Sequence, residues 1–206
     1  MECFVFPLQQ TNLFPLTTKP LNIFEARYIK MINDSIEQGI PIALGYVPEN
    51  GDTYRSIAGF GMPQIIDQRP DGSLLVFMIG QGKIRLDHRS QQNTSLEQSG
   101  LSQTETYIKT QGEVIYDDLN LNDQLKNKYM VLSQLLVRWV QKHVPDSGQR
   151  EIFVRSLKGP QEIIGAFAAY LIRDYDLQYE MMEIFSLNEQ INFLYRLFES
   201  NELTNV

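Results

Sequence analysis

The hydrophobic period of the chain changes near residue 118, and this change limits the folds that are open to it. Up to Asp118, short apolar runs alternate with turn residues, which is typical of β-strands. Beyond it, apolar residues recur at three- and four-residue steps, as they do on one face of an α-helix. The pattern predicts an α+β protein with a β-barrel-like subdomain over residues 1–118 and a helical bundle over residues 119–206.

The first subdomain is expected to hold several short strands and one packed helix. The strands are predicted over residues 3–8, 40–47, 57–68, 74–79, 83–87 and 106–116. Arg69-Pro-Asp-Gly72 is a turn sequence, so the strands on either side of it should form a hairpin. Gly80 and Gly82 are expected to mark the next connection. Asn22 and Glu25 resemble a capping box, which predicts a helix from Asn22 to Gln38.

One stretch of the first subdomain has little to bury. Residues 90–103 are rich in Ser, Gln, Asn and Thr. Such a composition predicts a mobile loop that can be shortened without loss of the fold.

The second subdomain reads as a series of helices. Leu125, Leu132, Leu136 and Trp139 lie on one face of a long helix that ends near His143. Further helices are expected from Pro160 to about residue 171, over residues 177–185 and over residues 187–198. Ser186 and Glu189 match a capping box before the last of them.

The composition argues against nucleic acid and membranes as partners. The net charge is −7 and the pI about 4.9, so phosphate backbones and anionic bilayers are repelled at long range. No apolar run is as long as the roughly 20 residues needed to span a bilayer. Residues 1–12 also lack the basic region of a secretory signal. With Cys3 as the single cysteine, no internal disulfide can form. We therefore expect a soluble, cytoplasmic protein.

No catalytic, cofactor-binding or metal-binding motif emerges. Gly82-Lys83 lacks the glycine that a phosphate-binding loop places five residues earlier. His88 and His143 are the only histidines, they fall in different subdomains, and no Cys/His metal spacing exists. Cys3 lies in an apolar strand, where a buried thiol is favoured over a nucleophile. The chain is therefore expected to be non-enzymatic, with no cofactor and no metal.

A string of motifs runs through the N-terminal segment. It reads Phe4-Val-Phe-Pro-Leu8, then Leu13-Phe-Pro15, then Pro20-Leu-Asn-Ile-Phe-Glu-Ala-Arg-Tyr28, then Met31. This string resembles the opening of the Lon protease N-terminal, substrate-binding domain family, whose pattern is FPL, LFPG, PLxIFExRY and a methionine. Leu16 stands where the family has the glycine of its second motif, so the turn there is expected to be different or looser.

Two later segments fit the same family. Pro70-Asp-Gly72, Gly80 and Lys83-Ile-Arg85 follow its hairpin and basic strand, and residues 163–197 follow its helical tail, with Gln190 in place of an arginine. The resemblance covers nearly the whole chain. It implies a barrel like that of pseudouridine synthases and archaeosine transglycosylases (PUA-like), followed by a helical bundle. In Lon proteases an ATPase and a peptidase module follow, and since this chain ends at residue 206 neither activity is expected of it.

The resemblance implies that the chain binds unfolded or tagged polypeptide, as an adaptor in protein quality control that works with a protease or chaperone. Within the most specific match, Phe14, Phe24, Arg27 and Tyr28 are the candidate contacts. At helical spacing Phe24 and Tyr28 also suit the core, whereas Arg27 lies on the charged face of the same helix. An apolar groove is expected at the seam between the subdomains.

Two other functions compete with polypeptide binding. One is RNA binding, because PUA-like barrels bind RNA, but the acidic pI and the lack of a long basic run count against it. The other is an unrecognised hydrolase, for which no nucleophile–base pair emerges.

Overall fold

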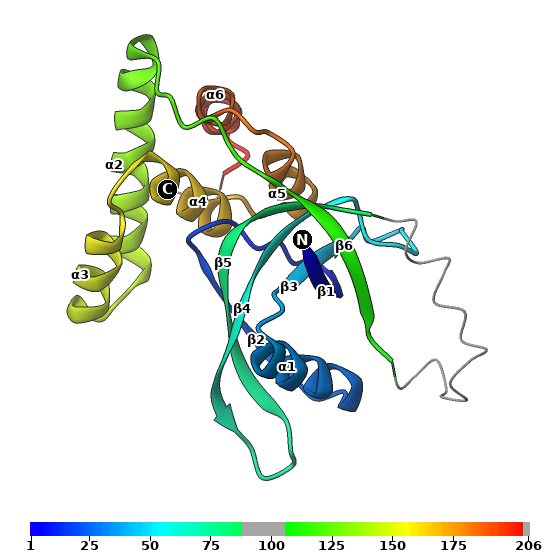
Figure 1. Cartoon of the computed structure of the whole chain (residues 1–206). Coiled ribbons are helices and arrows are strands. Elements are labelled where there is room, and N and C mark those ends of the chain that lie inside the picture. Colours follow the sequence, from blue (N-terminus) through cyan, green and yellow to red (C-terminus); the bar gives the residue numbers. More distant parts are fainter. Residues whose placement is uncertain (88–105, 204–206) are drawn as a thin grey trace. The chain divides into compact units, whose positions relative to one another are not determined.

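The computed structural model describes residues 1–87 and 106–203, and the chain divides into two compact units, Met1–Ile115 and Tyr116–Val206. Figure 1 shows that strands and one helix make up the first unit, whereas helices dominate the second. Residues 1–118 and 119–206 were the division expected from the sequence. His88 and the loop predicted over residues 90–103 lie outside the described residues.

The first unit is a mixed six-stranded sheet that bends into a near-barrel ring. Its strands are β1 (Glu2–Gln9), β2 (Thr18–Ile23), β3 (Ile42–Val47), β4 (Ile57–Gln68), β5 (Leu74–Leu86) and β6 (Ile108–Ile115). The strand order is β2-β5-β4-β3-β1-β6, and β6 also pairs with the second half of β5. β1 runs parallel to β3, and the other pairings are antiparallel. The expectation of a barrel-like sheet with a hairpin at residues 69–72 is confirmed.

The expected connection at Gly80 and Gly82 is wrong, because β5 runs through both residues without a break. The pairing of β4 with β5 shifts register between Phe60 and Gly61, beside Gly80. A β-carbon on Gly80 would stand 2.1 Å from the carbonyl oxygen of Phe14. The glycine therefore accommodates a crossing backbone segment inside a continuous strand.

The expected helix start at Asn22 is also wrong. Asn22 belongs to β2, and helix α1 (Ala26–Gln38) begins only after Glu25, which forms no side-chain cap hydrogen bond. Alternate residues of β2 point the same way, and Ile23 at its end is buried. At the other end of α1, Gly39 has a φ of 67° and donates its N–H to the carbonyl of Ser35, so the expected end is confirmed.

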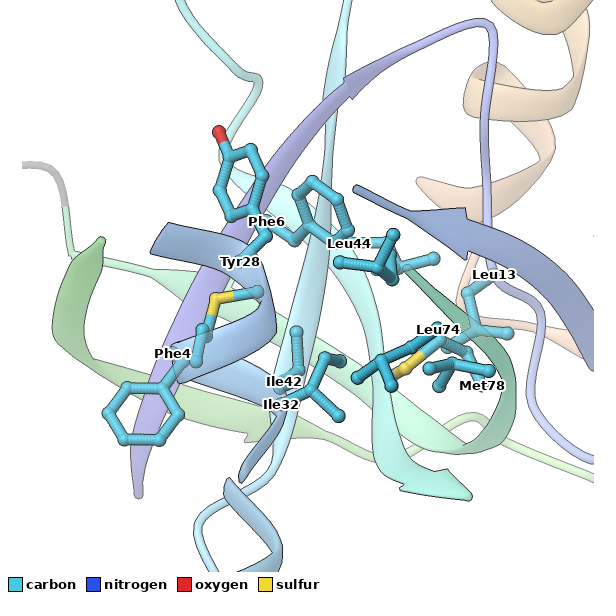
Figure 2. Close-up of a cluster of buried hydrophobic side chains, with 12 residues drawn as sticks. Phe4, Phe6, Leu13, Tyr28, Ile32, Ile42, Leu44, Leu74 and Met78 are labelled. Atoms are coloured by element: carbon cyan, nitrogen blue, oxygen red, sulfur yellow. The ribbon is translucent and has the colours of Figure 1, made fainter. Parts of the chain in front are cut away.

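Helix α1 contributes one face to the core of the ring. Its Tyr28, Met31 and Ile32 pack against side chains from β1, β3 and β5 (Figure 2). A second cluster includes Cys3, Tyr54 and Ile84. The first cluster holds α1 against the sheet, and thus places the chain between β2 and α1.

The second unit contains a short 3-10 turn and five helices among the described residues. They are α2 (Lys126–His143), α3 (Ser147–Ser156), α4 (Pro160–Leu171), α5 (Tyr175–Met182) and α6 (Leu187–Glu199), with the turn η3 (Asp123–Leu125) before α2. Leu132 and Leu136 of α2 are fully buried, which confirms the predicted apolar face. The sequence did not predict α3, which begins after Asp146 and buries no residue completely. Ser186 precedes α6 but makes no cap bond through its side chain, so its capping box is wrong. In the described part of the chain, no helix combines the length and apolar character that crossing a membrane requires.

Candidate functional site

A pocket of about 270 Å³ opens in the first unit where β1, β2 and α1 meet. Its lining comes from the second half of β1 and from the segment that joins β2 to α1: Phe6, Pro7, Leu8, Asn22, Ile23, Phe24, Glu25, Arg27 and Tyr28. Sites for drug-sized ligands span about 300–1,000 Å³, so this pocket suits one large side chain better than a whole small molecule.

Two aromatic rings form the inner wall of the pocket. The centroids of Phe6 and Tyr28 lie 4.2 Å apart, and Figure 2 shows the rings side by side. Both side chains are nearly buried. Burial raises the pKa of the Tyr28 hydroxyl, and this effect outweighs the opposing charge of Arg27. Tyr28 therefore stays neutral at physiological pH and gives the pocket an apolar wall.

Phe24 stands at the rim with its ring in solvent. Its exposed fraction is 76%. The helical spacing that favoured the core for both Phe24 and Tyr28 holds for Tyr28 alone, because Phe24 precedes the first turn of α1. Outside the helix, its side chain does not follow the helical period. An aromatic ring this exposed next to an apolar pocket is a surface that a partner can cover.

Arg27 lies at the rim, where it contacts both Glu25 and Tyr28. Its Nη2 and Nε lie 2.8 and 2.9 Å from the Oε2 of Glu25, and its guanidinium carbon lies 4.5 Å from the centroid of the Tyr28 ring. The residue is partly exposed, as its place on the charged face predicted. The ion pair with Glu25 and the stacking on Tyr28 together give the apolar pocket a charged edge.

The structure brings together three of the four residues that the sequence singled out. Phe24, Arg27 and Tyr28 line the pocket, whereas Phe14 is 3% exposed and lies elsewhere in the unit. The contribution of Phe6 to Leu8 was not predicted. The Phe-Pro-Leu motif identified this segment as part of the family pattern. Strand alternation alone does not predict that these residues lie next to α1.

The turn that follows Phe14 contains a residue, Leu16, in a backbone conformation that glycine normally adopts. The carbonyl of Phe14 accepts the N–H of Thr17 at 3.2 Å, with Pro15 second and Leu16 third in the turn. Leu16 has a φ of 61°, as the third position of a type II turn requires. Whether the turn differs from that of the family, as the sequence predicted, stays a prediction. The positive φ shows that the leucine adopts a conformation that favours glycine. That conformation costs a leucine about 1–2 kcal/mol.

The remaining chemical candidates lie away from this pocket. Burial raises the pKa of the Cys3 thiol to about 11, which keeps it protonated and confirms a core cysteine. His143 lies in the last turn of α2, with its Nδ1 2.9 Å from the carbonyl of Trp139. Across residues 1–87 and 106–203, no group of three or more His, Cys, Asp or Glu side chains could hold a metal ion.

Comparison with known protein families identifies the family of this chain. Residues 2–200 match the model of the ATP-dependent protease La (LON) substrate-binding domain. The chain belongs to the Lon substrate-binding domain family. The match covers a substrate-binding domain and no catalytic domain. A comparison with curated proteins gave no match.

Two solved structures share the fold of this Lon substrate-binding domain. One is a Lon N-terminal domain protein from Xanthomonas campestris, with 15% identity, a TM-score of 0.66, and coverage of 95% of this chain and 98% of that one. The other is the N-terminal domain of a Mycobacterium avium complex Lon protease, with 15% identity, a TM-score of 0.66, and coverage of 97% and 98%. At this identity the likeness establishes the α+β fold.

Proposed function

We propose that this Lon substrate-binding domain binds unfolded polypeptide, with an apolar client side chain in the pocket beside Phe24, Arg27 and Tyr28. The observation that carries the proposal is the exposed ring of Phe24 next to an apolar pocket. Covering one such side chain contributes roughly 1.5–3 kcal/mol. Aromatic and arginine side chains around a pocket are also the usual anchors of protein interfaces.

The charged rim supports a polypeptide ligand as well. The Arg27–Glu25 pair places donors and acceptors at the edge of the pocket, where the backbone of a bound chain would pass. Charged groups at an interface rim contribute to orientation and association rate more than to affinity. The proposal therefore assigns the affinity to Phe24 and the pocket wall, and the positioning of the client to Arg27.

The proposal extends to the role of an adaptor that passes clients to a protease or chaperone. The family takes its name from an ATP-dependent protease, which makes polypeptide the expected class of ligand. A cytoplasmic location also belongs to the proposal, since the single cysteine is a buried thiol.

Titration of a fluorescently labelled, permanently unfolded protein into the purified chain tests the proposal. Arg27→Glu is expected to weaken binding about fivefold, close to 1 kcal/mol, with the melting temperature unchanged. Arg155→Glu is the matched control, because Arg155 forms an exposed ion pair with Glu151 in the second unit. It makes the same charge change and should leave binding intact.

Nuclease treatment before the titration separates this function from RNA binding. Binding that survives the nuclease supports polypeptide recognition. Loss of all binding after nuclease treatment contradicts polypeptide recognition. Equal binding by wild type and Arg27→Glu removes Arg27 from the site.

A further inference from the structure

Within residues 1–87 and 106–203, no strand covers the outer edge of β2. The strand stands at the end of the strand order and pairs only with β5 in the described part of the chain. The N–H of Gly80 donates to the carbonyl of Thr17 at 2.9 Å. This bond shows which residues of β2 direct their backbone groups toward β5. Because hydrogen-bonded and non-hydrogen-bonded pairs alternate in antiparallel strands, the backbone groups of Thr18, Pro20 and Asn22 point away from β5.

The three outward-facing residues of β2 are all exposed at the surface. Pro20 carries no N–H, so its place at an outward position removes no hydrogen bond from the ladder with β5. The free edge therefore offers two N–H donors, from Thr18 and Asn22, and three carbonyl acceptors. Only another extended backbone presents donors and acceptors at the matching spacing.

Exposed apolar side chains lie at both ends of this edge. Leu16 precedes β2 and is 53% exposed, and Phe24 follows β2 at the rim of the pocket. Leu16 holds a positive φ that favours glycine, and strained residues of this kind cluster at ligand sites. The exposure of Leu16 is explained if its side chain contacts a ligand.

We propose that an extended client segment docks on β2 as an additional strand, with Leu16 and Phe24 contacting its two ends. This inference rests on the proposed polypeptide-binding function and adds the mode of recognition. Six strand residues at about 3.4 Å each span roughly 20 Å. The ligand is therefore a segment of about six to eight residues with an apolar side chain near each end, one of which enters the pocket.

A foreign segment fits this edge better than a second copy of the chain. If two copies paired along β2, each Pro20 would leave an acceptor of the other copy without a donor. Proline at an exposed edge is a common way to prevent such self-pairing. A client without proline loses only one such hydrogen bond, opposite Pro20, whereas self-pairing loses one in each copy.

Hydrogen exchange on the intact chain tests the mode of docking. The probe is an eight-residue peptide with an isoleucine near each end, compared with the same peptide methylated on alternate backbone nitrogens. The unmodified peptide should slow amide exchange at Thr18 and Asn22 at least tenfold. Methylation of the nitrogens that face β2 should weaken binding at least tenfold.

The possible results distinguish docking on β2 from polypeptide binding in general. If the peptide binds without protecting Thr18 and Asn22, and methylation has no effect, docking on β2 is overturned while polypeptide binding stands. If neither the peptide nor an unfolded protein binds, both proposals are overturned.

Leu16→Gly provides a second, independent readout. Glycine adopts the positive φ freely, so the melting temperature should stay the same or rise, while affinity for the peptide should fall about fivefold. Leu119→Gly is the matched control, since Leu119 is 47% exposed in the second unit. It should not change peptide affinity. Unchanged affinity in Leu16→Gly removes Leu16 from the site and overturns docking along the whole of β2.

Discussion

The carbonyl oxygen of Leu13 lies 1.6 Å from the position that a β-carbon on Gly59 would occupy. Any side chain at Gly59 would displace the segment that leads through Phe14 and Leu16 to β2. Gly59→Ala is therefore expected to destabilise the chain by about 3 kcal/mol or more, measured by denaturant unfolding. Gly148→Ala in α3 is the control, because the nearest contact is a side-chain atom of Asp146 at 3.3 Å. The control should change stability by less than about 1 kcal/mol. Similar effects of the two substitutions would contradict the close approach.

Truncation of the N-cap residue to alanine should lower stability more at α5 than at α6. The Oδ1 of Asp174 accepts the N–H groups of Asp176 and Leu177 at 2.8 and 3.1 Å, whereas Ser186 makes no cap bond through its side chain. Asp174→Ala should cost about 1 kcal/mol and Ser186→Ala less than about 0.5 kcal/mol in thermal or chemical unfolding. A larger loss for Ser186→Ala would show that the capping box expected from the sequence forms after all.

The buried thiol of Cys3 should react only when the chain unfolds. Burial raises its folded pKa to about 11 from an ordinary value of 9.0. The protonated thiol is thus the form that the fold favours, so its contribution to stability is present below about pH 9 and is lost as the pH rises toward 11. At pH 8 a disulfide reagent should modify Cys3 only after a denaturant is added. Equal rates of modification with and without the denaturant would contradict the burial.

The sequence predicted the elements whose periodicity agrees with their packing. The apolar face of α2 is the clearest case, because Leu132 and Leu136 are both buried at helical spacing. The hairpin at residues 69–72 also followed from local turn chemistry, which does not depend on the rest of the fold. Prediction worked where the local signal and the tertiary environment favoured the same structure.

The errors arose where a tertiary contact decided the outcome. Asn22 has the chemistry of a helix cap, but pairing with Leu75 places it in β2. Gly80 has the chemistry of a turn, but the backbone of Phe14 passes over it within a continuous strand. The positive φ of Leu16 likewise accompanies a contact between distant segments, the hydrogen bond from its N–H to the carbonyl of Gly80 at 2.9 Å. No pattern within one segment encodes such contacts between distant ones.

The candidate site shows the same division between local and tertiary information. The motif around Phe24, Arg27 and Tyr28 pointed to the correct neighbourhood, and all three line the pocket. Helical spacing nevertheless assigned Phe24 to the core, because the true start of α1 lies after Glu25. The exposure of Phe24 became visible only once the boundary between β2 and α1 was known.

Phe24→Ser tests the central claim most directly. The variant, the wild type and the control Ile152→Ser are each titrated with the same labelled unfolded protein, alongside thermal melts. Ile152 is 72% exposed in α3, close to the 76% of Phe24, so the two substitutions remove equally exposed apolar side chains. Phe24→Ser should weaken binding at least about tenfold, or about 1.4 kcal/mol, with no loss of melting temperature, while Ile152→Ser binds like the wild type. Equal affinities of Phe24→Ser and the wild type for the unfolded protein would contradict the account.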